Sequence, residues 1–128
     1  MEYEVIVKKL NPHIEEEVTI KVNSFELVCF DPNGAIHWEV NKRYKAKIGF
    51  SVFNDLAMRE TKELFGFSQI DNTLGYYIRG KFDLDSRTMD AGIRIQFNED
   101  EFDLHDYSYW DGKNVEIRVD RINIELIK

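Results

Sequence analysis

Cysteine, proline, histidine and glycine are all sparse in this 128-residue sequence, which contains one, two, three and seven of them respectively. Because Cys29 stands alone, an intramolecular disulfide is excluded, and its apolar neighbours Val28 and Phe30 are typical of a small buried side chain. The glycines are scattered singly, without the clustering of a phosphate-binding loop. The histidines lie in separate segments, without the serine or cysteine pattern of nucleophilic catalysis. These absences favour a non-enzymatic protein.

Long hydrophobic runs are also missing. No segment approaches the roughly 18 apolar residues of a membrane-spanning helix. Residues 1–4 lack the basic start of a secretory signal peptide. Together with the single cysteine, these absences predict a cytoplasmic protein without membrane contact.

The composition is that of a folded, acidic chain, with 43% hydrophobic residues, 32% charged residues and a net charge of −7. A chain of this length can bury about two thirds of its surface, so we expect residues 1–128 to form a single domain. The net charge argues against general affinity for nucleic-acid phosphates. The charge is uneven: residues 40–54 hold four cations and no acid, whereas residues 95–112 hold six acids and no Lys or Arg. This distribution suits either solvated strand faces or two surface patches of opposite sign.

Apolar and polar residues alternate at a period of two, which is the pattern of β-strands. The alternation covers residues 3–7, 18–22, 25–29, 44–52, 76–84, 93–97 and 115–127. The turn sequence at residues 31–34 predicts a hairpin that leads into a short strand over residues 35–40. Residues 55–65 depart from the alternation, and the i,i+4 pair Arg59–Glu63 followed by Gly66 predicts one short helix there.

The apolar phase reverses twice, near Asn23-Ser24 and near residues 120–121. Such a reversal requires an extra residue or a change of sheet, so we predict two long strands that each bend midway. Bent strands that serve two sheets turn the corners of small barrels. We therefore predict an all-β, mainly antiparallel fold: a small barrel or β-sandwich with one short helix around residues 55–65. The strand order, with a helix after the third main strand, resembles the OB fold, which implies a scaffold shared by nucleic-acid, sugar and protein binders.

A basic ladder is the first candidate binding feature. If the strands over residues 44–52 and 76–84 are neighbours, then Lys45, Lys47, Arg79 and Lys81 share one outer face with Tyr77. Cations that meet phosphates beside a ring that stacks on bases are what single-stranded nucleic acid requires. Outward lysine and arginine residues that deter edge pairing are the alternative interpretation.

An aromatic segment within the acidic region is the second candidate, with Tyr107, Tyr109 and Trp110 after Phe102. Tyrosine and tryptophan are enriched at protein interfaces, so the segment suits a basic partner surface. It equally suits a loop that folds back and closes one end of the barrel.

A metal site would use Asp103, His105 and Asp106, but they match no zinc or calcium spacing, and an exposed acidic loop is the preferred interpretation. We expect no metal and no cofactor. The function that fits best is a non-enzymatic protein-interaction or binding module, which could self-associate. The alternatives are an OB-like single-stranded nucleic-acid binder and a small-ligand-binding barrel.

Overall fold

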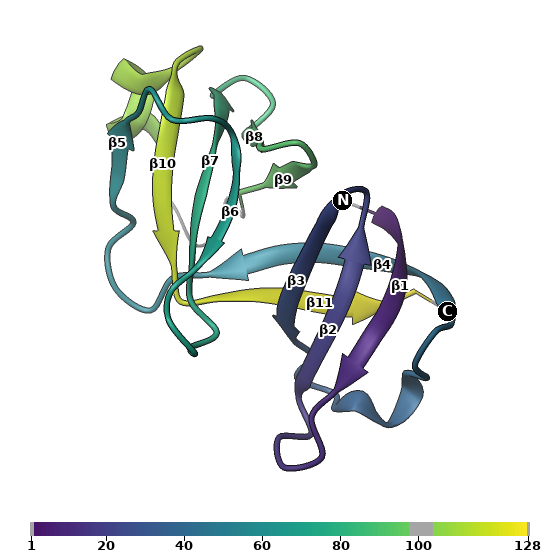
Figure 1. Cartoon of the computed structure of the whole chain (residues 1–128). Coiled ribbons are helices and arrows are strands. Elements are labelled where there is room, and N and C mark those ends of the chain that lie inside the picture. Colours follow the sequence, from purple (N-terminus) through teal and green to yellow (C-terminus); the bar gives the residue numbers. More distant parts are fainter. Residues whose placement is uncertain (1, 98–103, 128) are drawn as a thin grey trace.

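The computed structural model describes residues 2–97 and 104–127, whose strands form two sheets (Figure 1). One sheet closes into a barrel in the order β1-β2-β3-β11-β4. Its strands are β1 (Glu2–Leu10), β2 (Glu17–Val22), β3 (Phe25–Phe30), β4 (Arg43–Ser51) and β11 (Arg121–Leu126). Neighbouring strands are antiparallel except β3 and β11, which are parallel. The predicted all-β class with a small barrel is confirmed.

The second sheet is inserted in the sequence between β4 and β11. It has the order β5-β10-β7-β8-β9, and β6 also pairs with β7. Its strands are β5 (Met58–Glu60), β6 (Gly66–Gln69), β7 (Tyr76–Asp83), β8 (Thr88–Asp90), β9 (Arg94–Gln96) and β10 (Asn114–Val119). Only Asp120 separates β10 from β11, so one run of chain passes from the second sheet into the barrel (Figure 1). The bend that the sequence predicts near residues 120–121 is this crossing.

The phase reversal near Asn23-Ser24 has a different cause. β2 and β3 are separate strands joined by a two-residue turn, with Val22 opposite Phe25 and with Asn23 at a φ of 52°. Opposite residues of an antiparallel pair share one face. A two-residue turn therefore moves the inward positions from even to odd numbers, and the predicted long bent strand is wrong at this point.

The predicted helix over residues 55–65 is also wrong. That segment contains β5 and loop, because pairing with β10 supplies its backbone partners and overrides a weak helical propensity. The helical turns of the described chain are short 3₁₀ segments, η1 (Ala35–His37) and η2 (Leu104–Trp110). η1 replaces the strand predicted over residues 35–40. A buried hydrogen bond joins the two ends of the loop that contains η1: the Trp38 indole donates to the Asp31 carboxylate at 2.7 Å.

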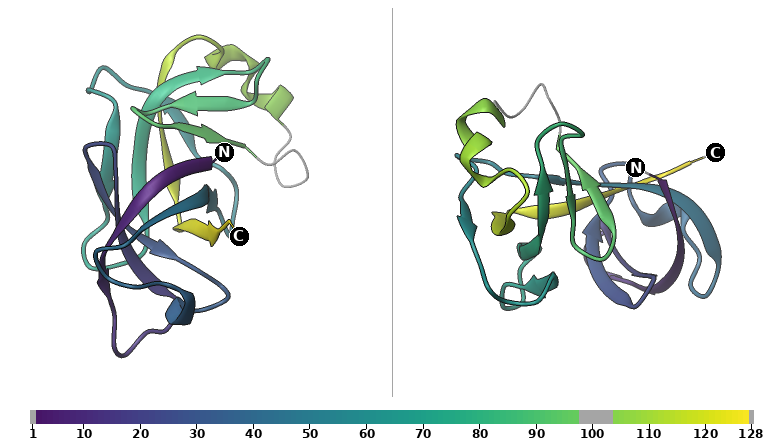
Figure 2. Two further views of the ribbon diagram at one scale, coloured as in Figure 1. Left: turned by 90° about the vertical axis from the view of Figure 1, so that its right-hand side faces the viewer. Right: turned by 90° about the horizontal axis from the view of Figure 1, so that it is seen from above.

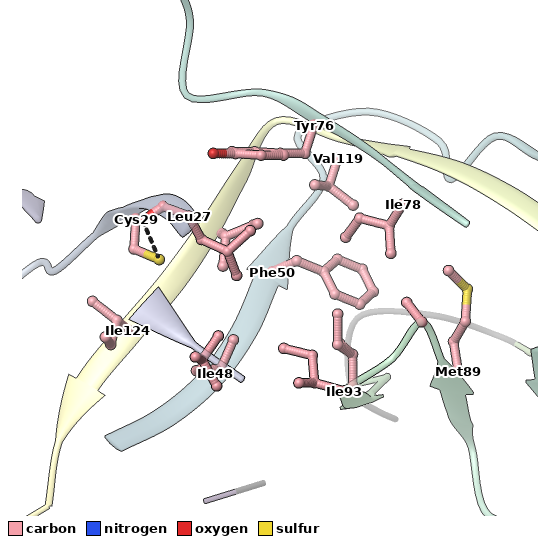
Figure 3. Close-up of a cluster of buried hydrophobic side chains, with 14 of the residues drawn as sticks. Leu27, Cys29, Ile48, Phe50, Tyr76, Ile78, Met89, Ile93, Val119 and Ile124 are labelled. Atoms are coloured by element: carbon pink, nitrogen blue, oxygen red, sulfur yellow. Dashed lines mark hydrogen bonds between the residues drawn. The ribbon is translucent and has the colours of Figure 1, made fainter. Parts of the chain in front are cut away.

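One hydrophobic cluster includes buried side chains from both sheets (Figure 3). Phe50 of the barrel packs edge-to-face on Phe97 with ring centroids 5.3 Å apart. Tyr76 extends from β7 to the barrel, where its hydroxyl accepts a hydrogen bond from the Val28 amide at 2.8 Å. Burial raises the pKa of Tyr76 to about 12. Each sheet thus shields part of the other from water, while a single domain over residues 1–128 stays a prediction.

A second tie between the sheets lies where β9 runs close to β1 (Figure 2). The Tyr3 hydroxyl of β1 donates a hydrogen bond to the Arg94 carbonyl of β9. The two strands belong to different sheets, so this contact holds the rim of the barrel against the edge of the second sheet.

Gly80 marks a change of partner along one side of β7. β6 pairs with Tyr76–Arg79 and β8 with Lys81–Asp83, which leaves Gly80 between them. A Cβ atom at Gly80 would collide with the Asp90 carbonyl oxygen and would lie 2.9 Å from the Ala91 Cα. Glycine is therefore required here by close approach of another backbone.

Candidate binding surface on the second sheet

The outward face of the second sheet has a buried carboxylate at its centre. Glu116 of β10 lies directly opposite Arg59 of β5 on one side and Arg79 of β7 on the other. Arg59 donates from Nε at 3.0 Å and from Nη2 at 2.6 Å to one carboxylate oxygen, and Arg79 Nε donates to the other at 2.8 Å. The register of three antiparallel strands thus places a cation on each side of Glu116.

Burial and charge act on Glu116 in opposite directions. Its side chain is only 5% exposed, and burial alone would raise its pKa, but the hydrogen bonds and charges of Arg59 and Arg79 outweigh burial and lower it. Arg79 is 17% exposed and also bonds Ser68 Oγ at 2.9 Å and Glu63 at 2.6 Å. Arg59 is 72% exposed, so its own ion pair is screened by water and contributes less. The centre of the face is therefore rigidly bonded, while its Arg59 side remains open to solvent.

The next row of the same face carries Tyr77 of β7 opposite Arg118 of β10. Arg118 is exposed, and the described part of the chain offers it no ion pair. Between this row and the Glu116 row lies a hollow of about 170 Å³. Its lining residues are Ala57, Met58, Arg59, Tyr77, Glu116 and Arg118. Ala57, in this lining, is exposed.

Lys81 lies on the same face at its far end, opposite Asn114 of β10 and Asp90 of β8. Three arginines and Lys81 therefore stand around Tyr77 and Glu116, with Glu63 and Asp90 as acidic neighbours. Asp83, at the end of β7, also lies on this face, so the four cations stand beside four acids and the local charge is nearly balanced in a chain whose net charge is −7.

The other half of the predicted basic ladder lies elsewhere. Lys45 and Lys47 belong to β4 of the barrel, and β4 pairs with β1 and β11 rather than with β7. The expectation that the two basic strands are neighbours is therefore wrong. Lys47 stands opposite Glu2 and Glu125, which is the arrangement of Glu116 with its signs reversed. Lys45 likewise stands opposite Glu4, and the two lysines share no face with Tyr77 because they belong to the other sheet.

Comparison with known proteins gives one match, which covers nearly the whole chain. The model of a family described as Uncharacterised conserved protein UCP019853 matches residues 1–127. The chain belongs to this family. No curated protein and no solved structure gave a match. Since the matched range includes both sheets, the barrel and the inserted sheet together are what the family model covers.

The aromatic segment of this family member lies in η2, beside β5. Tyr107 is turned inward, and its hydroxyl donates to the Leu56 carbonyl at 2.7 Å. Tyr109 is 70% exposed, packs edge-to-face on Trp110 at 4.9 Å, and lies under the Lys113 ammonium at 3.7 Å. Tyr107 therefore fixes the segment to the sheet, while Tyr109 remains available to solvent.

The candidate metal ligands predicted from the sequence do not form a metal site in the described residues. Asp103 lies outside them, and His105 and Asp106 are exposed on η2. Across residues 2–97 and 104–127, no group of three or more His, Cys, Asp and Glu side chains is arranged to hold a metal ion. No helix within those residues has the length and hydropathy to cross a bilayer.

Sequence reasoning missed three residues of the face: Arg59, Glu116 and Arg118. Arg59 was missed because a helix was expected over residues 55–65, so the residue was not placed in a sheet. Glu116 and Arg118 occupy outward positions of a strand that the alternation does predict, but its sheet neighbours were not evident. The signal that could have found them is the matching alternation of residues 115–119 and 76–81, which places charged side chains on one face once the strands pair.

Proposed function

We propose that this chain is a non-enzymatic binding module built on an OB-like barrel, and that the outward face of the second sheet contacts an acidic segment of a partner protein. The observation that carries the proposal is the pair of exposed arginines, Arg59 and Arg118, on the same face as Tyr77 in an acidic chain. Arginine bonds carboxylates through a planar fork of donors, and a local positive potential steers acidic partners.

The barrel supports this proposal through its topology. The order β1-β2-β3-β11-β4, with β3 parallel to β11, is the strand arrangement expected of an OB-like barrel, a scaffold whose members bind diverse ligands. The second sheet is inserted in the connection before the last barrel strand. Loops in that position carry binding residues in OB folds.

Charge reversal at Arg118 tests the proposal. Arg118→Glu should leave folding intact, because Arg118 is exposed and makes no ion pair within the described chain. Fluorescence anisotropy with a short labelled peptide rich in Asp and Glu should show affinity about tenfold weaker for the variant, equivalent to about 1.4 kcal/mol. The matched control is Lys9→Glu, an equal charge change at an exposed residue of β1 in the barrel. Equal binding by both variants, or no binding by the wild-type chain at low salt, would overturn the proposal.

Single-stranded nucleic acid is the second candidate partner, and the flat ring of Tyr77 among cations favours it. The same titration with labelled oligo-dT separates the two candidates. Tighter binding of oligo-dT than of the acidic peptide, lost in Arg118→Glu, would support the nucleic-acid function instead.

A further inference from the structure

The hollow between Arg59 and Arg118 has room for one side chain. Its volume of about 170 Å³ lies below the roughly 300–1,000 Å³ of small-molecule sites. Engineered protein cavities of roughly 150 Å³ that are lined by carbon bind benzene. The hollow therefore suits a single group of about that size, carried by a larger molecule.

The surface of the hollow is mainly carbon, even though its lining includes two arginines and Glu116. An arginine lays its methylene stem along a surface and keeps its guanidinium in water, so Arg59 and Arg118 can supply apolar walls. Glu116 adds little polar surface, because its side chain is 5% exposed and its two oxygens already accept hydrogen bonds from Arg59 and Arg79. Water in such a hollow has few hydrogen-bond partners, so an apolar group that displaces it gains free energy.

Two cations at the rim of the hollow remain available to a partner. Arg59 is 72% exposed, and Arg118 is exposed and forms no ion pair within residues 2–97 and 104–127. The other acids of the face are held elsewhere, since Glu63 is paired with Arg79 and the two aspartates lie around the far end of β7. An apolar hollow with two cations at its rim is complementary to an apolar side chain that has carboxylates beside it.

We propose that this hollow binds the ring of one phenylalanine in the partner's acidic segment, while carboxylates beside that phenylalanine meet Arg59 and Arg118. A phenyl ring matches the volume, and arginine guanidinium groups stack on aromatic faces. Tyr77, also in the lining, adds an aromatic neighbour. Interfaces concentrate their affinity where an aromatic anchor fills a small pocket inside a polar rim. This inference rests on the proposed function and names the side chain that the surface recognises.

Three synthetic peptides test the inference: one acidic sequence with phenylalanine, leucine or asparagine at its centre. In fluorescence anisotropy, the wild-type chain should bind the phenylalanine peptide about tenfold more tightly than the asparagine peptide. The leucine peptide should lie between them, because leucine keeps the apolar contact but cannot stack on a guanidinium group. Added sodium chloride should weaken all three alike, since it screens the carboxylates and leaves the apolar contact intact.

A substitution in the lining should remove this preference. Ala57→Gln places a polar amide in the hollow without changing any charge, so the ratio between the phenylalanine and asparagine peptides should fall to about one. Asn114→Gln, on the same face outside the hollow, is the matched control and should keep the tenfold ratio. In NMR spectra of the wild-type complex, the peptide's ring protons should show nuclear Overhauser effects to the Ala57 methyl group and the Arg118 methylene groups.

The possible outcomes separate this inference from the proposed function. Equal affinity for the phenylalanine and asparagine peptides, a leucine peptide that binds most tightly, or a preference that survives Ala57→Gln would overturn the inference and leave the acidic-partner proposal standing. Failure of the wild-type chain to bind any peptide would overturn both. Phe53 and Phe65 are exposed, so dimerisation of the wild-type chain that the phenylalanine peptide reverses would assign the hollow to a second copy and overturn the inference.

Discussion

Replacement of Gly80 by alanine gives the most direct test of how the second sheet is packed. The added Cβ would collide with the Asp90 carbonyl oxygen, and it would lie 2.6 Å from the carbonyl carbon of that residue and 2.9 Å from the Ala91 Cα. All three atoms belong to backbone, so relief requires the end of β8 to move away from β7. Forced overpacking of this kind costs about 3 kcal/mol.

Two opposing effects set the expected magnitude. Alanine restricts the unfolded chain, which stabilises a compatible site by about 0.4–1 kcal/mol. The net loss expected for Gly80→Ala is therefore about 2 kcal/mol of unfolding free energy. Gly49 of β4 is the matched control, because no atom lies within 4 Å of its Cβ position and its φ is not positive. Gly49→Ala should gain about 0.5 kcal/mol.

The assay is urea unfolding of both variants and the wild-type chain, followed by far-UV circular dichroism. The two variants should differ by about 2.5 kcal/mol, which corresponds to roughly 10 °C in melting temperature for a chain of this size. Both replacements are glycine to alanine within a strand, so the unfolded-state effect is shared. If Gly80→Ala is as stable as Gly49→Ala, the close approach of β8 to β7 is not as described.

Three further predictions concern titratable side chains. The pKa of Glu116 is lowered from its ordinary value of 4.5, so the ionised carboxylate should stabilise the fold at pH values above 4.5. This stabilisation should be lost as the pH falls through the lower folded-state pKa. In urea unfolding at several pH values, Glu116→Gln should reduce the decrease in stability at acid pH. Tyr76 has a pKa of about 12 against 10.0 when unfolded, so it should contribute stability that is lost between about pH 10 and 12. Tyr76→Phe should remove this alkaline loss and should cost about 1–3 kcal/mol of unfolding free energy at neutral pH, because the Val28 amide is left unpaired. Both effects can be read from urea unfolding curves. Burial raises the pKa of the Cys29 thiol, so a maleimide dye should label it only as the chain unfolds in urea, and rapid labelling of the native protein would contradict its placement in the core.

Strands with strict alternation could be predicted from the sequence because the signal is local. The pattern over residues 44–52 became β4 (Arg43–Ser51), and the pattern over residues 76–84 became β7 (Tyr76–Asp83). In each case the alternation also identified the buried side chains, since inward positions need no knowledge of the partner strand.

Strand partners could not be predicted in the same way, because pairing is decided by contacts far apart in the sequence. Lys47 and Arg79 both stand on outward positions, yet they belong to different sheets. The helix expected around Arg59 failed for the same reason: the segment pairs as β5 with β10, where Arg59 lies opposite Glu116, 57 residues away in the sequence. The candidate surface was therefore half visible, with its β7 residues predicted and its β5 and β10 residues missed.

The insertion of the second sheet between β4 and β11 has a consequence for the order of folding. During synthesis, β1 to β4 leave the ribosome long before β11, the strand that lies between β3 and β4 in the barrel wall. Until β11 arrives, the barrel stays open on that side, with unpaired backbone along β4 and apolar side chains exposed. All strands of the second sheet precede β11 in the sequence, so that sheet can pair before β11 reaches the gap. The entry and exit of the insertion are tied by the Asp120 amide, which donates to the Ser51 carbonyl at 2.9 Å. A weakened second sheet should therefore delay closure of a barrel whose own residues are unchanged.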